Sequence, residues 1–212
     1  MNASQSPGMD KSSLHRRFRK NSEQELILSG TFLPMAPTNL SIRPPVESDA
    51  HRLAVIHIAA WRAAYRGVMS DEYLDGLDVG RHTDGWRRNI LNPRNGTVHL
   101  VAQVDDELVG FAIVGPGENT SDPSVGQLYA INLHPEWWAK GIGTVLFAAA
   151  EEMLVSLGYQ AGFLWVEAGN DRAISFYTKR GWLDDGGTME DARFDPPVVE
   201  RRHSRSWKGG PH

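Results

Sequence analysis

The sequence predicts a single mixed α/β domain. The chain has 212 residues, which against a typical domain of about 150 residues allows one domain with an appendage. Hydrophobic residues make up 41% and charged residues 23%, as in ordinary globular proteins. Apolar, β-branched runs alternate along the chain with segments of helical period. Together these observations exclude wholesale disorder and a fibrous repeat.

The charge balance and the missing residue types exclude several functions. Lys and Arg number 22 against 26 Asp and Glu, a net charge of −4, so we expect no nucleic-acid partner and no anionic membrane surface. Cysteine is absent, which removes disulfides, thiolate metal sites and a cysteine nucleophile and favours a cytoplasmic location. No apolar run approaches the roughly 20 residues that span a bilayer.

The two ends of the chain differ in composition from its middle. Residues 1–39 are rich in Ser, Asn, Gln and Pro, hold one basic cluster at His15–Lys20 and show no sustained apolar period, so we expect a flexible tail. Only the short run Leu26–Leu28 follows that cluster, which is too little for a secretory signal. We expect the domain over residues 40–207 and a loose C-terminus over 208–212.

The domain should begin with a short strand and three helical segments. Ile42–Pro44 predicts an edge strand, because proline lacks an N–H. Ser48-Asp49 predicts the N-cap of a helix that ends at Arg66-Gly67. Apolar residues recur in it at steps of three and four, namely Leu53, Ile56, Ala60 and Ala64. Ser70–Glu72 opens a second helical segment, and Arg81–Leu91 predicts a third.

Three strands should follow. Thr97–Val104 and Leu108–Val114 are apolar, β-branched runs on either side of Asp105–Glu107, which predicts an antiparallel hairpin. Gly126–Leu133 predicts the next strand.

The last third alternates helix and strand. Gly141 begins a helix that runs to Leu157 and is stopped by Gly158. The strand Phe163–Val166 and the helix Arg172–Arg180, capped by Asn170-Asp171, come next. Strand, helix and strand in this order form a right-handed βαβ unit with parallel strands. The final strands are expected at Trp182-Leu183 and Val198–Trp207, which completes a mixed sheet.

The segment Leu133–Thr144 joins the end of a strand to the start of a helix through Gly141 and Gly143. A helix start offers unpaired N–H groups and a positive dipole end, glycines let an anion approach the backbone, and Lys140 adds a charge. The segment is therefore a candidate phosphate site, although a tight turn explains the two glycines equally well when they are taken alone.

Known phosphate-binding and hydrolase motifs can be compared with this segment. A Walker A loop is excluded, because Lys140 precedes Gly141. A dinucleotide fold remains the alternative: Glu167 follows at roughly the distance expected of a ribose-binding acid, but Leu146 stands where that motif needs a small residue. His134 lies in no metal-binding pattern, and the nucleophile motif of serine hydrolases is absent.

The segment Trp165–Trp182 carries a resemblance. Its pattern Asn-Xaa-Arg-Ala-Xaa-Xaa-Phe-Tyr-Xaa-Xaa-Xaa-Gly-Trp, following Gly-Ile-Gly at 141–143 in order and spacing, closely resembles the signature of the GNAT superfamily of N-acetyltransferases. The segment Ala60–Gly67 is also similar to bacterial members. The likeness covers about Ser41 to Trp207 and implies a GNAT-type fold: a mixed, mostly antiparallel sheet flanked by helices.

The resemblance implies that acetyl-CoA is the cosubstrate, without a metal. The backbone N–H groups of one segment should hold its pyrophosphate: Trp138, Ala139, Lys140, Gly141, Ile142, Gly143 and Thr144. Ile131 and Leu133 should pair with pantetheine like an added strand, and the N–H of Leu133 is a candidate oxyanion donor. The second cofactor segment contributes Asn170, Arg172, Ala173 and Tyr177. Packing and capping would also account for several of these residues.

Acetyl transfer to an amine makes two proton demands. The amine has an unperturbed pKa near 10 and must lose a proton, while the departing thiolate gains from one. By resemblance, Tyr177 is the candidate acid. Gln127 stands where many relatives carry a glutamate, so Glu167, Tyr129 or a water chain must serve as the base, and Glu167 is the best remaining acid. Trp61, Tyr65 and Tyr129 are expected to line the acceptor pocket.

We therefore expect an N-acetyltransferase that moves an acetyl group to a primary amine by direct attack. The acceptor, a small molecule or a protein amine, is not specified by the sequence. The alternative from another class is an acyl-CoA-binding sensor without turnover, which Gln127 favours and Tyr177 opposes. The last strand, Val198–Trp207, could pair two copies into a homodimer.

Overall fold

The computed structural model describes residues 36–192, 194 and 196–207, all within the unit Pro34–His212. The tail expected over residues 1–39, apart from 36–39, and the expected loose end at 208–212 lie outside the described residues.

The described residues form a seven-stranded sheet in the order β1-β2-β3-β4-β5-β7-β6. Only β4 and β5 pair in parallel, and every other neighbouring pair is antiparallel. The predicted mixed, mostly antiparallel sheet is therefore confirmed. The strands are β1 Leu40–Arg43, β2 Val98–Val104, β3 Glu107–Pro116, β4 Val125–Leu133, β5 Ala161–Glu167, β6 Leu183–Asp191 and β7 Val198–Ser206.

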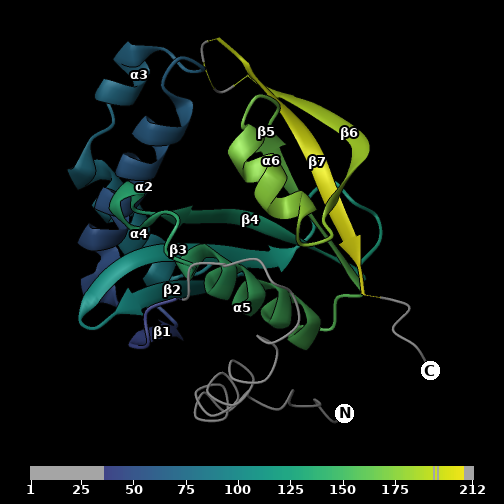
Figure 1. Cartoon of the computed structure of the whole chain (residues 1–212), viewed down its shortest axis with the longest axis horizontal. Coiled ribbons are helices and arrows are strands. Elements are labelled where there is room, and N and C mark those ends of the chain that lie inside the picture. Colours follow the sequence, from purple (N-terminus) through teal and green to yellow (C-terminus); the bar gives the residue numbers. More distant parts are fainter. Residues whose placement is uncertain (1–35, 193, 195, 208–212) are drawn as a thin grey trace, which may run out of the picture. The chain divides into compact units, whose positions relative to one another are not determined.

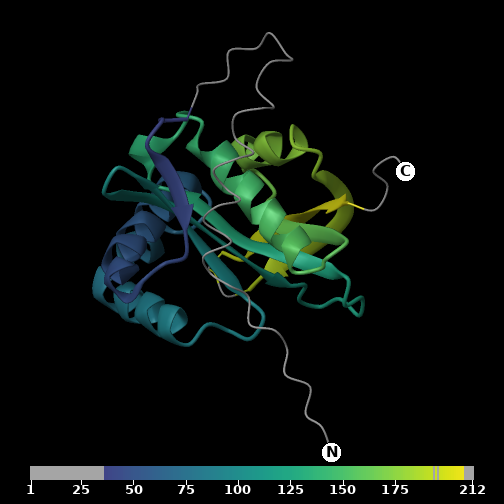
Figure 2. The same cartoon turned by 90° about the horizontal axis from the view of Figure 1, so that it is seen from below.

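Helices cover both faces of the sheet (Figures 1 and 2). The α-helices are α2 Ala50–Tyr65, α3 Asp71–Asp75, α4 Val79–Leu91, α5 Ile142–Ser156 and α6 Asp171–Thr178, and two short 3-10 turns are η1 Glu47–Asp49 and η2 Pro135–Trp137. On one face, Phe111 of β3 packs into a cluster with Leu53 of α2 and Trp86 of α4. On the other, Gly126 of β4 faces α5, because an added Cβ would lie 2.7 Å from the Leu154 side chain. The alternation of strand residues thus separates two layers of core.

The first helix begins for a different reason from the one expected. Asp49 stands at the N-cap position, but its side chain makes no cap bond to α2. Its carboxylate instead accepts from the Arg43 guanidinium at 2.7 and 3.0 Å and from the Val46 N–H at 2.7 Å. This nearly buried ion pair fixes the end of β1 against the helix start, and together the hydrogen bonds and the Arg43 charge lower the pKa of Asp49 despite its burial.

The sheet also differs from the prediction at its C-terminal edge. β6 has nine residues where only Trp182-Leu183 was expected, because its Asp- and Gly-rich sequence lacks apolar alternation and the strand is held by pairing with β7. β7 pairs with both β5 and β6. It therefore offers no free edge through which a second copy could pair. Among the described residues, no helix combines the length and apolarity needed to cross a membrane.

Candidate active site

The two central parallel strands separate shortly after they meet. β4 pairs with β5 only from Val125 to Gln127, opposite Ala161 to Phe163, although β4 continues to Leu133 and β5 to Glu167. The register between β3 and β4 shifts just beyond this point, since Ile113 lies opposite Ala130 and Val114 opposite Leu128. Tyr129 is therefore the extra residue of a β-bulge, which bends its strand. In Figure 1 the ribbons of α2 and α6 lie on either side of β4; we call the region where β4 and β5 are no longer paired the opening.

The second half of β4 has an unpaired edge on this opening. The His134 N–H donates to the Val109 carbonyl of β3 at 2.9 Å, and successive residues of a strand direct their backbone groups to opposite sides. Ile131 and Leu133 therefore direct their N–H and C=O groups away from β3, toward the opening. The Leu133 carbonyl accepts a hydrogen bond of 2.9 Å from the Trp138 indole.

A concave turn of backbone N–H groups follows this edge. Ala139 and Gly141 have positive φ angles of 59° and 76°, and alternation of left- and right-handed residues turns successive N–H groups toward one point. Among the described residues, no carbonyl accepts from the N–H groups of residues 139–143, whereas Trp138 N donates to Pro135 and Thr144 N to Gly141. Of residues 138–144, over which an anion site is predicted, residues 139–143 thus have N–H groups without a backbone acceptor at the start of α5, a geometry that suits an anion. We call residues 139–143 the N–H nest.

Two cations lie beside the nest. The Arg172 guanidinium, from the first turn of α6, stacks over the Trp138 ring at 3.7 Å from its centroid, and the Lys140 ammonium lies 4.5 Å from the centroid of Trp137. Asn170 caps α6 by accepting from the Ala173 N–H at 3.1 Å, which leaves its amide nitrogen for another partner. Arg172 thus joins the turn after β4 to the helix after β5.

Tyr177 is held by a cluster of rings. Its ring lies 5.7 Å from that of Phe147 in α5 and 5.6 Å from that of Phe176, and Phe147 is fully buried. Burial, with a contribution from Tyr65, raises the pKa of Tyr177 well above its ordinary value. The hydroxyl therefore stays protonated at neutral pH.

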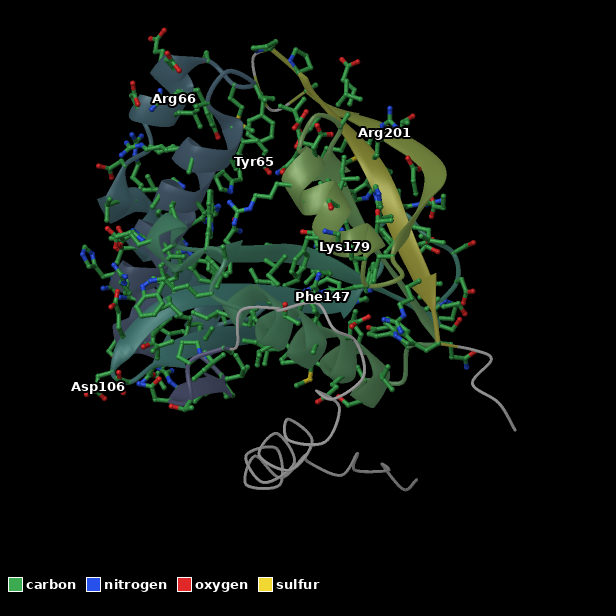
Figure 3. The ribbon with its side chains drawn as sticks, in the orientation of Figure 1. Tyr65, Arg66, Asp106, Phe147, Lys179 and Arg201 are labelled. Atoms are coloured by element: carbon green, nitrogen blue, oxygen red, sulfur yellow. The ribbon has the colours of Figure 1, made fainter. Side chains whose placement is uncertain are left out.

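Two carboxylates, those of Glu167 and Glu200, lie near Tyr65. Figure 3 shows Tyr65 on α2, beside the opening. Burial, together with the charges of the Glu200 and Glu167 carboxylates, raises the pKa of the Tyr65 hydroxyl to about 12. Glu167 is 8% exposed, lies directly opposite Glu200 across β5 and β7, and accepts from the Gly169 N–H at 2.7 Å. Glu200 was missed in the sequence, because only the strand register brings it beside Glu167.

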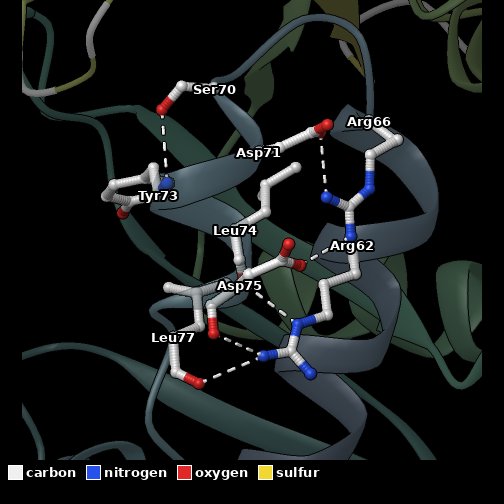
Figure 4. Close-up of polar contacts among 8 residues, drawn as sticks. All are labelled: Arg62, Arg66, Ser70, Asp71, Tyr73, Leu74, Asp75 and Leu77. Carbon is white, nitrogen blue, oxygen red and sulfur yellow. Dashed lines mark hydrogen bonds and ion pairs between the residues drawn. The ribbon is translucent and has the colours of Figure 1, made fainter.

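Aromatic side chains form the wall beside this pair. Trp61 contacts Tyr65 at 5.5 Å and Phe194 at 5.6 Å between ring centroids. The short helix α3 is fixed next to them by two arginines of the α2 segment (Figure 4): Arg62 donates to the Leu74 and Asp75 carbonyls at 2.9 and 3.1 Å, and Arg66 pairs with Asp71 and Asp75. The Arg62 side chain thus satisfies carbonyls at the end of α3 and holds this helix beside the aromatic wall.

Two residues considered from the sequence lie elsewhere. The Tyr129 hydroxyl donates to the Pro116 carbonyl, and Tyr159 and Arg94 are the charged or titratable groups near it. The structure therefore does not bring Tyr129 together with Trp61 and Tyr65. Gln127 is buried and accepts from the Glu118 N–H at 3.0 Å, so it holds the loop between β3 and β4.

The arrangement combines an anion site, an open strand edge, a protonated phenol and a buried carboxylate. Within the described ranges, no group of three or more His, Cys, Asp or Glu side chains could hold a metal ion. These groups suit transfer of an acyl group from a phosphorylated carrier to a nucleophile, with proton transfer on both sides of the opening.

Comparison with known proteins gives the family. The model of the acetyltransferase (GNAT) family matches residues 54–182, more than half of the chain. The chain belongs to this family.

Individual relatives agree with this result. The chain is 29% identical over 138 residues to the uncharacterized N-acetyltransferase YuaI of Bacillus subtilis, covering 65% of this chain and 77% of that protein. It is 24% identical to spermidine N(1)-acetyltransferase of Thermoplasma acidophilum, over 78% of this chain and 98% of that protein. The crystal structure of PaiA N-acetyltransferase from the same organism, in complex with coenzyme A, shares the fold with a TM-score of 0.61 at 22% identity, covering 79% and 98% of the two chains.

The protein is thus a GNAT N-acetyltransferase, an acyltransferase that uses acetyl-CoA and an amine. The described residues fit that cosubstrate, because the N–H nest has five donors without an acceptor and the adjoining edge of β4 has no partner strand. The dinucleotide fold considered from the sequence is not the one found.

Proposed function

We propose that this GNAT acetyltransferase acetylates a primary amine that reaches the site as a cation, by direct attack of the amine on the thioester. The observation that carries the proposal is the unpaired edge of β4, which ends at the N–H nest. A carrier that bears a phosphate and amide groups can bind there like an added strand.

Residues of both halves would hold acetyl-CoA. The N–H nest and the Arg172 guanidinium suit its pyrophosphate, while Ile131 and Leu133 suit the pantetheine amides. The amide nitrogen of Asn170 is a further donor to the pantetheine arm. The Leu133 N–H faces the opening and is our candidate for the oxyanion that forms when the amine attacks the acetyl carbonyl.

Glu167 and Tyr177 would move the two protons. The carboxylate pair of Glu167 and Glu200 attracts an ammonium group, and Glu167 takes one of its protons, directly or through water, so that a neutral amine attacks. The amine nitrogen then forms a bond to the acetyl carbon, and the carbon–sulfur bond breaks. Acetyl-CoA supplies the activated acetyl group, and Tyr177 donates its proton to the departing thiolate. The acetylated nitrogen loses its second proton, which returns to Tyr177 through water.

Two variants test these roles. Tyr177→Phe should lower kcat by roughly 10²- to 10⁴-fold while the Kd for acetyl-CoA, measured by calorimetry, changes less than threefold. Tyr159→Phe is the matched control and should leave kcat unchanged. An unchanged kcat in Tyr177→Phe would contradict its role as the acid.

Glu167→Gln tests the base by its pH profile. The variant should lose activity most strongly near neutral pH and recover it as the pH approaches the pKa of the free amine acceptor, because the amine then arrives deprotonated. A uniform loss at all pH values would show that Glu167 acts only through structure.

A further inference from the structure

A second concave site lies on the α2 and α4 side of the sheet. Its volume is about 320 Å³, at the small end of the roughly 300–1,000 Å³ typical of small-molecule sites. Trp86 and Phe111, both buried, form an aromatic floor, and Ile113 and Ala130 of β3 and β4 add an aliphatic wall. His57 of α2 also borders it.

The polar groups that line this site carry no negative charge. His82, Arg81 and Asn89 come from α4, and no Asp or Glu is among the lining side chains. The His57 ring lies 5.5 Å from that of His82, and burial together with the His82 charge lowers the pKa of His57 to about 4. His57 is therefore neutral at pH 7. A guanidinium, an amide and imidazoles favour a ligand group that accepts hydrogen bonds, such as a carboxylate or a carbonyl.

Gly85 contributes no side chain to the site. It lies within α4 and lines the cavity, although glycine lowers the stability of a helix interior relative to alanine. A Cβ added there would meet only the far end of the Arg88 side chain, at 3.9 Å. Neither packing nor a positive φ angle requires a glycine at this position. A larger side chain at residue 85 would instead take up space at the cavity.

The cavity shares a helix and a strand with the transfer site. His57, Trp61 and Tyr65 follow one another at steps of four residues along α2, with ring centroids 5.0 Å and 5.5 Å apart. Two helical turns, roughly 12 Å, separate His57 from Tyr65. Ala130, in the cavity wall, directly precedes Ile131 on the strand whose edge faces the opening.

We propose that this cavity binds the end of the acceptor that does not react, and that this end is a flat apolar group carrying a carboxylate or carbonyl oxygen. The inference rests on the proposed function. The acceptor would then place its amine near Glu167 and Glu200 and its apolar end over Trp86 and Phe111. A polyamine is disfavoured, because no carboxylate among the lining side chains could pair with its far ammonium.

Acceptors of matched length test the proposal. An extended tetrapeptide spans roughly 13 Å, so Ala-Ala-Ala-Phe, with a free amino terminus and a free carboxylate, matches the two helical turns between His57 and Tyr65. Its kcat/KM should exceed that of Ala-Ala-Ala-Ala and of spermidine at least tenfold in the wild-type protein. A ratio near one, or a preference for spermidine, would overturn the proposal while leaving acetyl transfer to amines intact.

Substitutions at Gly85 locate the effect in the cavity. Gly85→Ala is the control and should keep the tenfold preference. Gly85→Leu and Gly85→Phe should reduce it progressively toward one without changing kcat/KM for spermidine, and circular dichroism checks that each variant is folded. An undiminished preference in both Gly85→Leu and Gly85→Phe would refute the assignment.

A binding measurement separates the two proposals. N-acetylphenylalanine has no free amine and cannot be acetylated, so its calorimetric Kd reports the cavity alone. Gly85→Phe should weaken this Kd at least tenfold and Gly85→Ala should not. If no amine is turned over but this pattern holds, the proposed function fails and the ligand site stands; equal Kd values in wild type and Gly85→Phe would refute the ligand site.

Discussion

The strongest pH effect on stability should come from His57. Its pKa is lowered from 6.5 to about 4 by burial and by the neighbouring His82, so between these two values the unfolded chain binds a proton that the folded protein does not. Stability must then rise with pH across that window and fall as the pH drops through it. At about 1.36 kcal/mol per unit, the full difference is about 3 kcal/mol, of which about 2 kcal/mol is lost between pH 7.5 and 5.0.

His57→Phe tests this value. Phenylalanine keeps a ring against Trp61, Trp86 and Phe111 but does not titrate. Urea unfolding at pH 7.5 and at pH 5.0 should show the free energy of unfolding of the wild type falling by about 2 kcal/mol more than that of the variant. His51→Gln, at an exposed histidine of the same helix, is the control and should fall as steeply as the wild type. Parallel losses in wild type and His57→Phe would refute the reasoning.

Four further substitutions test the packing around the two sites. Gly85→Ala should stabilise the protein by about 1 kcal/mol and raise Tm by about 3 °C in a thermal melt, because its Cβ meets only the far end of the Arg88 side chain, at 3.9 Å; an unchanged or lower Tm would show that the backbone requires a glycine at this position. Arg62→Ala should cost about 1–3 kcal/mol in urea unfolding, since it strips the hydrogen bonds from the Leu74 carbonyl and its neighbours at the end of α3. Trp138→Ala and Arg172→Ala, alone and combined, should show a coupling of about 1 kcal/mol in the same assay; additive losses would mean that the stacked pair contributes nothing.

Local patterns in the sequence predict most of the helices and strands and the order in which the site segments follow one another along the chain. The hairpin around Asp105–Glu107, the helix that starts after Gly141 and the cap at Asn170 all follow from nearby residues, and the structure confirms each of them. Capping at Asp49 was wrong in mechanism, because Arg43, six residues away in the chain, competes for its carboxylate. An ion pair with a residue outside the helix can thus take the carboxylate that would otherwise cap the helix N-terminus.

Some features of the site also follow from neighbouring residues, whereas others depend on how the strands pair. The N–H nest is a local feature of residues 139–143 and follows from a glycine-containing turn before a helix. The pairing of Glu167 with Glu200 is set by register, which two strands joined through a helix and another strand do not reveal in one sequence. The bulge at Tyr129 is a third case, because an extra residue on β4 is defined only against β3. The Tyr129 hydroxyl donates to the Pro116 carbonyl and lies apart from the aromatic wall of Trp61, Tyr65 and Phe194.

The stripe formed by His57, Trp61 and Tyr65 has a role that its sequence pattern alone does not predict. Steps of four residues place three rings on one face of α2, and core packing is sufficient to account for that pattern in a sequence. Through His57 the stripe also borders a concave site, which Gly85 of α4 lines without a side chain. A cavity forms between elements that lie far apart in the chain, so a pattern of neighbouring residues does not predict it. Under this proposal, the acceptor specificity of the enzyme depends on Gly85, although neither a positive φ angle nor packing requires a glycine there.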